Sequence, residues 1–443
     1  MSNAAAPRRS PGGSTARRDP SDHGESPVGR VRTGSDSCPG VLRPHTAADG
    51  LLVRVRLPGG RLDGGQAEAL GAAAERFADG AIGLTSRGNA ELRGIAADAM
   101  TGLAAALDAA GLLPSAAHER IRNVLASPLS CLDGAGFADA QEWARRLDAL
   151  LRENDWTAAL SGRFLFAFDD GRGDLAALGA DLTLTAAPDG TALLTPGGHR
   201  VPARLAPEAA LAAARAFLEA ARDTGAWRMR ELPPHRRPDI AAALRAAGIE
   251  HPQAPGRAPV TGAAPHPGPP PLGAVTGPDG RVSLSVAPRL GRVTAAQWRA
   301  LLPAPELRLT PWRGVVVAGP PGRTPHRARA LLDTLAVRHG FTTSDDSPWR
   351  GVGACTGLPG CARALADVRA DAGPRTGALP EYWSGCERRC GHPHGAWVDR
   401  VATGPGRYRE TVHTPPPDAR TTGAASTPGT ASTPGTAGTP GTS

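Results

Sequence analysis

Four of the six cysteines in this 443-residue chain lie close together near its C-terminal end. They form two pairs, Cys355-Thr-Gly-Leu-Pro-Gly-Cys361 and Cys386-Glu-Arg-Arg-Cys390, with the spacings C-x5-C and C-x3-C. Thiolates from two loops suit a [4Fe–4S] cluster, because each iron of the cluster takes one soft thiolate ligand. The two glycines and the proline of the first loop allow its backbone to bend tightly around such a group. The sequence therefore predicts a [4Fe–4S] site at these four cysteines.

Three other interpretations of the cysteines compete with this one. A structural zinc site also uses four thiolates, but its pairs are usually spaced C-x2-C, which neither pair shows. Two disulfides would require an oxidising compartment, and we see no secretory signal in the sequence. The four cysteines could also be reduced and unrelated to one another. We favour the iron–sulfur interpretation over these three because the spacing is more specific than a lone C-x-x-C.

The basic side chains indicate what kind of substrate the protein could bind. The formal net charge is +8, and all 50 Lys and Arg residues are arginine. There is no dense basic helix and no aromatic–basic pattern, so we expect no nucleic-acid binding. The planar guanidinium group bonds two carboxylate oxygens at once, which suits a carboxylate-rich anionic substrate. No apolar run is long enough to span a bilayer, and we expect a cytoplasmic protein without a membrane partner.

The elements that must position these residues follow a similar order twice along the chain. Apolar periodicity predicts strand, helix, strand, strand, helix, which is compatible with a ferredoxin-like α+β unit. A similar order returns after a proline-rich stretch and indicates an internal repeat. The expected strands cover 51–57, 82–85, 90–95 and 282–286, and the expected helices cover 67–77, 101–110, 296–302 and 325–339.

Several stretches, in a fixed order, resemble the siroheme nitrite/sulfite reductase superfamily and, within it, the precorrin-3B synthase family of aerobic cobalamin biosynthesis. The similarity covers about residues 38–400 and includes the spacing of both cysteine pairs. The stretches that carry it are Cys38-Pro-Gly, Asp49-Gly-Leu-Leu-Val-Arg-Val, Leu84-Thr-Ser-Arg-Gly-Asn-Ala-Glu-Leu-Arg-Gly-Ile95, Arg122-Asn-Val124, Ala126-Ser-Pro-Leu129, Asp169-Asp-Gly171 and Ser384-Gly-Cys-Glu-Arg-Arg-Cys-Gly-His-Pro393.

The resemblance implies an α+β fold in which a ferredoxin-like half-domain and a nitrite/sulfite-reductase-type α/β domain occur twice. It places the [4Fe–4S] cluster in the C-terminal half. The expected segments are a disordered tail at 1–37, ferredoxin-like half-domain 1 at 38–120, reductase-like α+β domain 1 at 121–250, a Pro-rich linker at 251–271, ferredoxin-like half-domain 2 at 272–340, the [4Fe–4S]-binding domain 2 at 341–410 and a low-complexity tail at 411–443.

The resemblance also implies an oxidoreductase that acts on an anionic tetrapyrrole. Precorrin-3A would be hydroxylated with O2, and an acetate side chain would close to a γ-lactone, giving precorrin-3B. The cluster would pass single electrons to a mononuclear non-haem iron. His392 and His394 are its nearest candidate ligands, although packing against the cluster loop is the simpler role for each. No nicotinamide or flavin site is evident, so we expect a ferredoxin or a separate reductase to supply electrons from NADH.

Four arginines are expected to contact the substrate carboxylates in the cleft where relatives hold siroheme: Arg87, Arg93, Arg122 and Arg163. Each could instead be a structural or solvated arginine. Reductases of the superfamily place two lysines on their substrate anion, but the corresponding run here, Arg163-Phe-Leu165, keeps one positive charge. This departure favours the synthase over the alternative, a sulfite or nitrite reductase with siroheme as its cofactor. A non-catalytic iron–sulfur or zinc protein is the third hypothesis.

Overall fold

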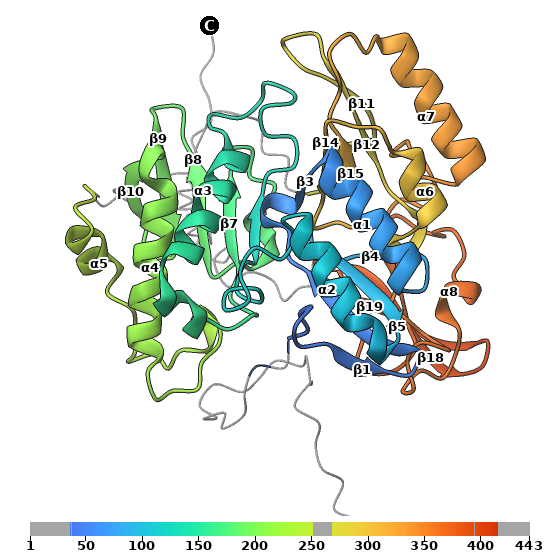
Figure 1. Ribbon diagram of the computed structural model, residues 1–443, viewed down its shortest axis with the longest axis horizontal. Coiled ribbons are helices and arrows are strands. Elements are labelled where there is room, and N and C mark those ends of the chain that lie inside the picture. Colours follow the sequence, from blue (N-terminus) through green and yellow to red (C-terminus); the bar gives the residue numbers. More distant parts are fainter. Residues whose placement is uncertain (1–35, 37, 251–267, 394, 415–443) are drawn as a thin grey trace, which may run out of the picture.

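The computed structural model describes residues 36, 38–250, 268–393 and 395–414. Most of both predicted tails lies outside these ranges; only residue 36 of the first tail and residues 411–414 of the second are described. Residues 251–267 of the predicted linker also lie outside them. The described chain forms four sheets with helices packed on them (Figure 1). Among the described residues, no helix has the length and apolar character needed to cross a membrane.

Two ferredoxin-like units repeat the same order of elements. The first contains β1 (His45–Ala47), β2 (Gly50–Val55), β3 (Arg61–Asp63), α1 (Gly64–Phe77), β4 (Ala81–Leu84), β5 (Ala90–Ile95) and α2 (Met100–Ala109). The second contains β11 (Gly273–Thr276), β12 (Val282–Val286), β13 (Arg292–Thr294), α6 (Ala295–Ala300), β14 (Glu306–Leu309), β15 (Val315–Val317) and α7 (Pro325–His339). Seven elements therefore recur in one order, as the predicted internal repeat requires.

Hydrogen bonds at matching positions support this duplication. Asp63 accepts a hydrogen bond from the Gln66 amide, and the Gln66 side chain bonds back to the Asp63 amide, which forms a capping box at the start of α1. Thr294 and Gln297 form the same box at the start of α6. The turns after β4 and β14 also match, because Thr85 Oγ1 accepts from the Asn89 amide and Thr310 Oγ1 accepts from the Gly314 amide.

The two units exchange one strand each, which the sequence did not predict. The first sheet has the order β1-β2-β5-β4-β13, and the second has the order β11-β12-β15-β14-β3. Val293 of β13 thus pairs with Ile82 of β4, and Leu62 of β3 pairs with Leu307 of β14. The side chains between the two sheets form one continuous hydrophobic core. The expected half-domains at 38–120 and 272–340 are therefore interlocked, and neither sheet is built from one segment alone.

A third sheet follows the first unit and lies on the left in Figure 1. Its strands β6, β7 and β8 are parallel, and β9 and β10 continue antiparallel. Helices α3 and α4 cover one face and bury a separate apolar core. The elements are β6 (Val124–Ala126), α3 (Ala140–Glu153), β7 (Phe166–Asp169), β8 (Leu182–Ala186), β9 (Thr191–Thr195), β10 (His199–Pro202), α4 (Ala206–Ala221) and α5 (Ile240–Ala246).

The fourth sheet follows the second unit and carries both cysteine pairs in its loops. Its elements are β16 (Val352–Ala354), α8 (Val368–Asp371), β17 (Glu381–Ser384), β18 (Trp397–Gly404) and β19 (Arg407–His413). Strands β16, β17 and β18 are parallel, as β6 to β8 are in the third sheet. Strand β19 continues to His413, so ordered structure extends three residues into the segment predicted as a tail from 411.

Candidate functional site

The topology of the fourth sheet brings the two cysteine pairs together. Because β16 and β17 are parallel, their carboxyl ends meet at one edge of the sheet. Cys355 follows β16 directly, and Cys386 lies two residues after β17. The Gly385 amide donates a hydrogen bond to Cys355 Sγ (3.1 Å), and the Cys355 amide donates to the Trp383 carbonyl (3.0 Å). The start of the second pair is thereby fixed against the first.

The thiols influence one another electrostatically. Burial raises the pKa of Cys355, backbone N–H groups oppose this, and the neighbouring Cys361 and Cys386 raise it further. Burial also raises the pKa of Cys390, and the other three thiols of the group add to the rise. All six cysteines of the chain are described, and none forms a disulfide. The two disulfides considered for these residues are therefore absent from the structure.

The donor geometry differs from that of a site for one metal ion. In the described part of the chain, no three His, Cys, Asp or Glu side chains come close enough together to hold a single ion. A four-iron cluster makes a different demand, since each thiolate binds a different iron and the sulfurs stay further apart. The [4Fe–4S] cluster at the four cysteines therefore stays a prediction from their spacing.

Small residues are required where the two cysteine loops pack. Gly357 has φ +68°, and a Cβ atom there would lie 2.7 Å from Val368 Cγ2. A Cβ atom at Gly385 would lie 2.7 Å from Ala364 Cβ. The second loop is held by Tyr382, whose hydroxyl donates a hydrogen bond to the Cys390 carbonyl (2.6 Å). The backbone around the four thiols is thus held from both loops.

Arg93 lies at this site, but its partners belong to the protein. Its Nε and Nη2 atoms donate to the two carboxylate oxygens of Asp49 (3.0 and 2.9 Å), and Nη2 also donates to the Gly360 carbonyl (2.8 Å). The side chain is 11% exposed. Its donors tie β5 to the loop between Cys355 and Cys361, and its contact with substrate stays a prediction. We call the tie between β5 and this loop the Arg93 strap.

Three other arginines gather where the first and third sheets meet. Arg87 Nη1 donates to the Gly162 carbonyl (3.1 Å), beside Arg163 at the amino end of β7. Arg163 lies over the Trp227 ring at 4.9 Å, and its buried Nε has no hydrogen-bond partner. Arg56 is 4% exposed, and its guanidinium group donates to the backbone carbonyls of Pro39 and Arg120 at 3.3 Å. We call Arg56, Arg87 and Arg163 the arginine group.

Burial and neighbouring arginines outweigh the negative groups near Arg56 and Arg87, which include Glu119 and Asp181. No described carboxylate lies within ion-pair distance of any of its three guanidinium groups. Burial, followed by the charge of Arg54, lowers the pKa of Arg56 to about 9. Burial, followed by the charge of Arg228, lowers the pKa of Arg87 to about 10. A bound anion at this position would relieve both the burial penalty and the mutual repulsion.

Sequence analysis missed Arg56, although a signal was present. Arg54 and Arg56 alternate with apolar residues at the end of a predicted strand, so they belong to one face. The structure places Val53, Val55 and Leu92 in the core, so Arg54, Glu91 and Arg93 lie on the opposite face of the sheet. Arg54 pairs with Glu91, and Glu91 faces Arg93. This polar face connects the arginine group to the Arg93 strap.

Arg122 is not available to a substrate in this structure. Its Nε and Nη2 atoms bond both carboxylate oxygens of Asp148 on α3, and the Arg122 residue is 5% exposed. A bidentate ion pair of this kind satisfies the guanidinium group internally. The contact of Arg122 with substrate carboxylates stays a prediction, and in this structure its carboxylate partner is Asp148. Of the four predicted arginines, Arg87 bonds the carbonyl of Gly162, the residue before Arg163, whereas Arg93 and Arg122 have carboxylate partners within the protein.

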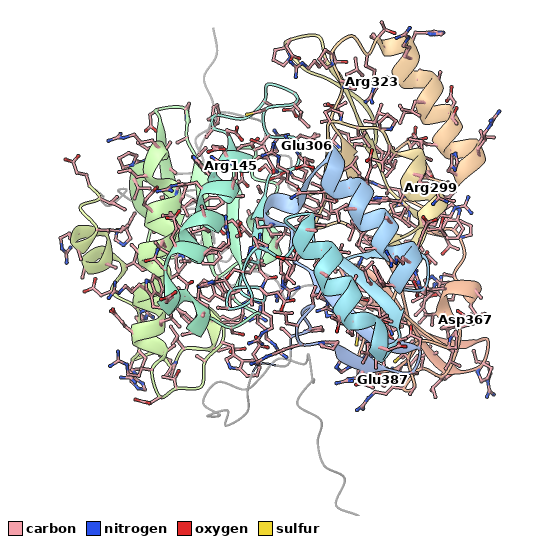
Figure 2. The ribbon with its side chains drawn as sticks, viewed as in Figure 1. Arg145, Arg299, Glu306, Arg323, Asp367 and Glu387 are labelled. Atoms are coloured by element: carbon pink, nitrogen blue, oxygen red, sulfur yellow. The ribbon has the colours of Figure 1, made fainter. Side chains whose placement is uncertain are left out.

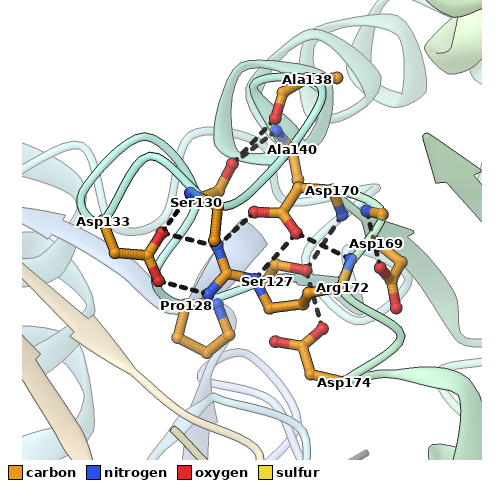
Figure 3. Close-up of polar contacts among 12 residues, drawn as sticks. Ser127, Pro128, Ser130, Asp133, Ala138, Ala140, Asp169, Asp170, Arg172 and Asp174 are labelled. Atoms are coloured by element: carbon orange, nitrogen blue, oxygen red, sulfur yellow. Dashed lines mark hydrogen bonds and ion pairs between the residues drawn. The ribbon is translucent and has the colours of Figure 1, made fainter. Parts of the chain in front are cut away.

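The opposite edge of the third sheet carries a buried acidic network (Figure 3). Arg172 bonds both Asp170 and Asp133, and Asp169 accepts from the amides of Gly171 and Gly173. Ser127 Oγ donates to Asp174 (2.8 Å), and burial, followed by the charge of Asp169, raises the pKa of Asp174 to about 8. These groups satisfy one another and fasten the loops after β6 and β7.

The histidines considered as iron ligands are only partly described. His392 stacks on Trp397 with ring centroids 5.2 Å apart and an interplanar angle of 8°, and Trp397 stacks in turn on His413. His392 Nδ1 lies 2.9 Å from the Pro393 carbonyl oxygen. This packing matches the simpler role considered for His392. His394 lies outside the described residues.

Comparison with known proteins gives consistent results. Residues 43–110 match the family model described as the nitrite/sulfite reductase ferredoxin-like half domain. A precorrin-3B synthase from Sinorhizobium sp. is 31% identical over 390 residues, which cover 83% of this chain and 80% of that protein. The sulfite reductase [NADPH] hemoprotein β-component of Xylella fastidiosa strain M23 is 29% identical over 163 residues, 31% of this chain and 28% of that protein.

A solved structure shows the same fold. The structure of the Mycobacterium tuberculosis NirA protein aligns with a TM-score of 0.63 over 87% of this chain and 78% of that chain, at 20% sequence identity. The similarity to the precorrin-3B synthase thus extends over most of both proteins, whereas the match to the sulfite reductase covers under a third of each.

Proposed function

Because the chain belongs to the precorrin-3B synthase family, we propose that it converts precorrin-3A to precorrin-3B with O2. The enzyme is an oxidoreductase of the nitrite/sulfite reductase fold. One oxygen atom of O2 enters the substrate, and two electrons and two protons reduce the other oxygen atom to water. An acetate carboxylate of the substrate closes the γ-lactone. The electrons come from an external donor, a ferredoxin or an NADH-dependent reductase.

The arginine group is the observation that carries this proposal. Arg56, Arg87 and Arg163 form a cationic site between two sheets, and no described carboxylate pairs with them. A tetrapyrrole with many carboxylates supplies the missing negative charges. Arg87 and Arg163, predicted from the sequence, would bind these carboxylates together with Arg56. Trp227, stacked on Arg163, fixes one side of the site.

A local departure supports the synthase over a sulfite or nitrite reductase. Reduction of a small inorganic anion needs concentrated positive charge at the anion. Leu165 stands where the resemblance places a second cationic side chain, and it is 4% exposed within a small apolar cluster with Leu125, Ala167 and Leu175. A neutral, buried residue there leaves Arg163 as the single charge of the Arg163-Phe-Leu165 run.

The cysteine site fits a cluster, and the proposal assigns Cys355, Cys361, Cys386 and Cys390 as its ligands. When bound, a [4Fe–4S] cluster would supply single electrons. The Gly385 N–H on Cys355 Sγ would stabilise the thiolate, and the Arg93 strap would hold the first cluster loop against β5. The described residues do not fit a mononuclear iron, because no group of three donors converges among them. We therefore assign no ligands to such an iron.

The test is a turnover assay with purified components. We expect anaerobically purified protein to contain iron and acid-labile sulfide without tetrapyrrole absorption bands. With precorrin-3A, O2 and a ferredoxin–reductase donor system, mass spectrometry should show a product one oxygen atom heavier. Cys355→Ser should lose iron, sulfide and product, because serine is a poor soft ligand. Cys131→Ser is the matched control and should retain all three, since Cys131 lies outside the site.

Other outcomes of the assay would contradict specific parts of the proposal. Siroheme bands in the purified protein, with sulfite or nitrite reduction in place of the heavier product, would support the reductase. Zinc without sulfide would remove the cluster assignment. Full iron and sulfide content in both Cys355→Ser and Cys386→Ser would show that these cysteines are not ligands.

A further inference from the structure

Ser384, the last residue of β17, carries a buried hydroxyl group without a hydrogen-bond partner among the described residues. The residue is 0% exposed, so its Oγ atom is not in contact with bulk water. A buried polar group without a partner is uncommon in folded proteins, because no hydrogen bond offsets its loss of hydration. Such a group points to an acceptor that the described chain does not supply.

The register of the fourth sheet places Ser384 beside the first of the four cysteines. Strands β16 and β17 are parallel, and their last registered pair joins Ala354 and Trp383. The Cys355 amide donates to the Trp383 carbonyl (3.0 Å), which continues this ladder by one residue and sets Cys355 against Ser384. Paired residues of neighbouring strands point to the same face of a sheet. The Ser384 hydroxyl and the Cys355 thiol therefore leave the sheet on the same side.

The same face of β17 carries the contact that holds the second cysteine pair. Tyr382 precedes Ser384 by two residues and therefore shares its face of the strand. The Tyr382 hydroxyl donates to the Cys390 carbonyl (2.6 Å). Glu387, the residue after Cys386, marks this part of the molecule at the lower edge of Figure 2. Both cysteine pairs are thus reached from the face that carries Ser384.

We propose that the Ser384 hydroxyl donates a hydrogen bond to a sulfur atom of the cluster bound at this site and thereby raises the midpoint potential of the cluster. The inference rests on the proposed function, because it takes the four cysteines as the cluster ligands. Reduction adds one electron from an external donor, and hence one negative charge, to the group that accepts the hydrogen bond. A more negative acceptor forms a stronger hydrogen bond, so the hydroxyl favours the reduced form. No covalent bond forms or breaks in this step.

The test is a redox titration of the anaerobically purified full chain, followed by electron paramagnetic resonance of the reduced cluster. Ser384→Ala should keep its iron and acid-labile sulfide but accept an electron less readily. We expect its equilibrium constant for one-electron reduction to fall about ten-fold, which corresponds to a potential lower by about 59 mV. Ser384→Thr keeps the hydroxyl and should stay near the unchanged protein. An unchanged potential in Ser384→Ala, as expected if the hydroxyl bonds a water molecule instead, would overturn the proposal.

A second pair of variants covers the case in which Ser384→Ala binds no cluster. Thr and Val side chains have nearly the same shape and differ in the hydroxyl group, so Ser384→Val should have a lower potential than Ser384→Thr. Equal potentials in these two variants would overturn the proposal.

The control is Ser344→Ala, which removes an exposed serine hydroxyl from the segment that follows α7. Its potential should equal that of the unchanged protein. A potential lowered in this control as much as in Ser384→Ala would show that the shift does not come from the Ser384 hydroxyl, and the proposal would fail.

The proposed function fails separately from this inference. If the variants differ in potential as expected but the unchanged protein does not convert precorrin-3A, the function is wrong and the hydrogen bond stands. If precorrin-3A is converted and all the variants share one potential, the inference alone is wrong. Iron and sulfide missing from the unchanged protein would contradict both.

Discussion

At the scale of single residues, burial acts in opposite ways at the two edges of the third sheet. At the amino edge it lowers the pKa of Arg56, in the arginine group, to about 9. At the carboxyl edge it raises the pKa of Asp174 to about 8. Burial thus disfavours the charged form at both edges, a cation at the first and a carboxylate at the second.

Asp174 gives a testable dependence of stability on pH. The carboxyl group ionises near pH 4 in the unfolded chain and near pH 8 in the folded protein. Between these values the folded state binds more protons, so the free energy of unfolding falls as the pH rises from about 4 to about 8. Each pKa unit of difference corresponds to about 1.4 kcal/mol. In Asp174→Asn the part of this slope due to Asp174 should disappear.

The measurement is urea unfolding at pH 5.5, 7 and 8 for both proteins. Asp346→Asn serves as the control, because Asp346 is an exposed carboxylate outside the network, and its slope should match that of the unchanged protein. If Asp174→Asn and the unchanged protein lose stability in parallel, Asp174 does not carry the proton.

At the scale of elements, the Arg93 strap joins β5 of the first unit to a cluster loop of the fourth sheet. Its contacts span 267 residues of sequence between Arg93 and Gly360. The polar face formed by Arg54, Glu91 and Arg93 continues from this strap towards the arginine group. Strand β5 therefore contributes Glu91 to the polar face and Arg93 to the strap.

Replacing Arg93 with Met should destabilise the protein by roughly 2–3 kcal/mol. Breaking a buried ion pair costs about 3–5 kcal/mol, and the partial exposure of Asp49 reduces this. The double variant Arg93→Met/Asp49→Asn should recover part of the loss, because no unpaired charge remains. Unfolding free energies of the two single variants and the double variant complete the cycle. A cost of less than about 0.5 kcal/mol for Arg93→Met would show that the pair is an ordinary surface ion pair.

At the scale of the whole molecule, the exchanged strands make the two halves interdependent. A fragment of residues 38–250 would lack β13, and the edge of β4 would be left unpaired. It would also lack Trp298, which is fully buried and donates a hydrogen bond to the Ala67 carbonyl of α1. Exposed strand edges and apolar faces promote aggregation.

We therefore expect fragment 38–250 to aggregate alone and to form a soluble complex when co-expressed with residues 268–414. Size-exclusion chromatography and circular dichroism would measure both outcomes, with the full chain as the reference. A folded, monomeric 38–250 fragment would mean that the shared core is dispensable.

Much of the architecture was predictable because it depends on local patterns. Apolar periodicity indicated the duplicated units. The cysteine pairs, together with several short motifs in a fixed order, resembled the precorrin-3B synthase family, and the comparison confirmed that family. The strand exchange was not predictable, because β3 and β13 have three residues each and pair with strands more than 200 positions away. Strands β16 and β17 of the fourth sheet were also missed, because three and four residues are too few to show a periodic pattern.

In the candidate site, too, the features with a local sequence pattern were predictable and those set by contacts between distant residues were not. The types of residue pointed to arginines and cysteines, but sequence spacing could not decide which guanidinium groups have internal partners. Asp148 lies 26 positions from Arg122 and Asp49 lies 44 positions from Arg93, and nothing local marks either carboxylate as a partner. The assignment of the four cysteines as cluster ligands stays a prediction for the turnover assay.

The duplicated turns after β4 and β14 have a consequence in evolutionary terms. Because each copy contributes one strand to the sheet of the other, neither copy could be deleted, but only one copy had to keep its functional residues. The turn after β4 retains Arg87 in the arginine group, whereas the matching turn carries Trp312, which packs on the apolar cluster around Leu165. The same turn thus places a buried cation beside the third sheet in one copy and an apolar anchor against that sheet in the other.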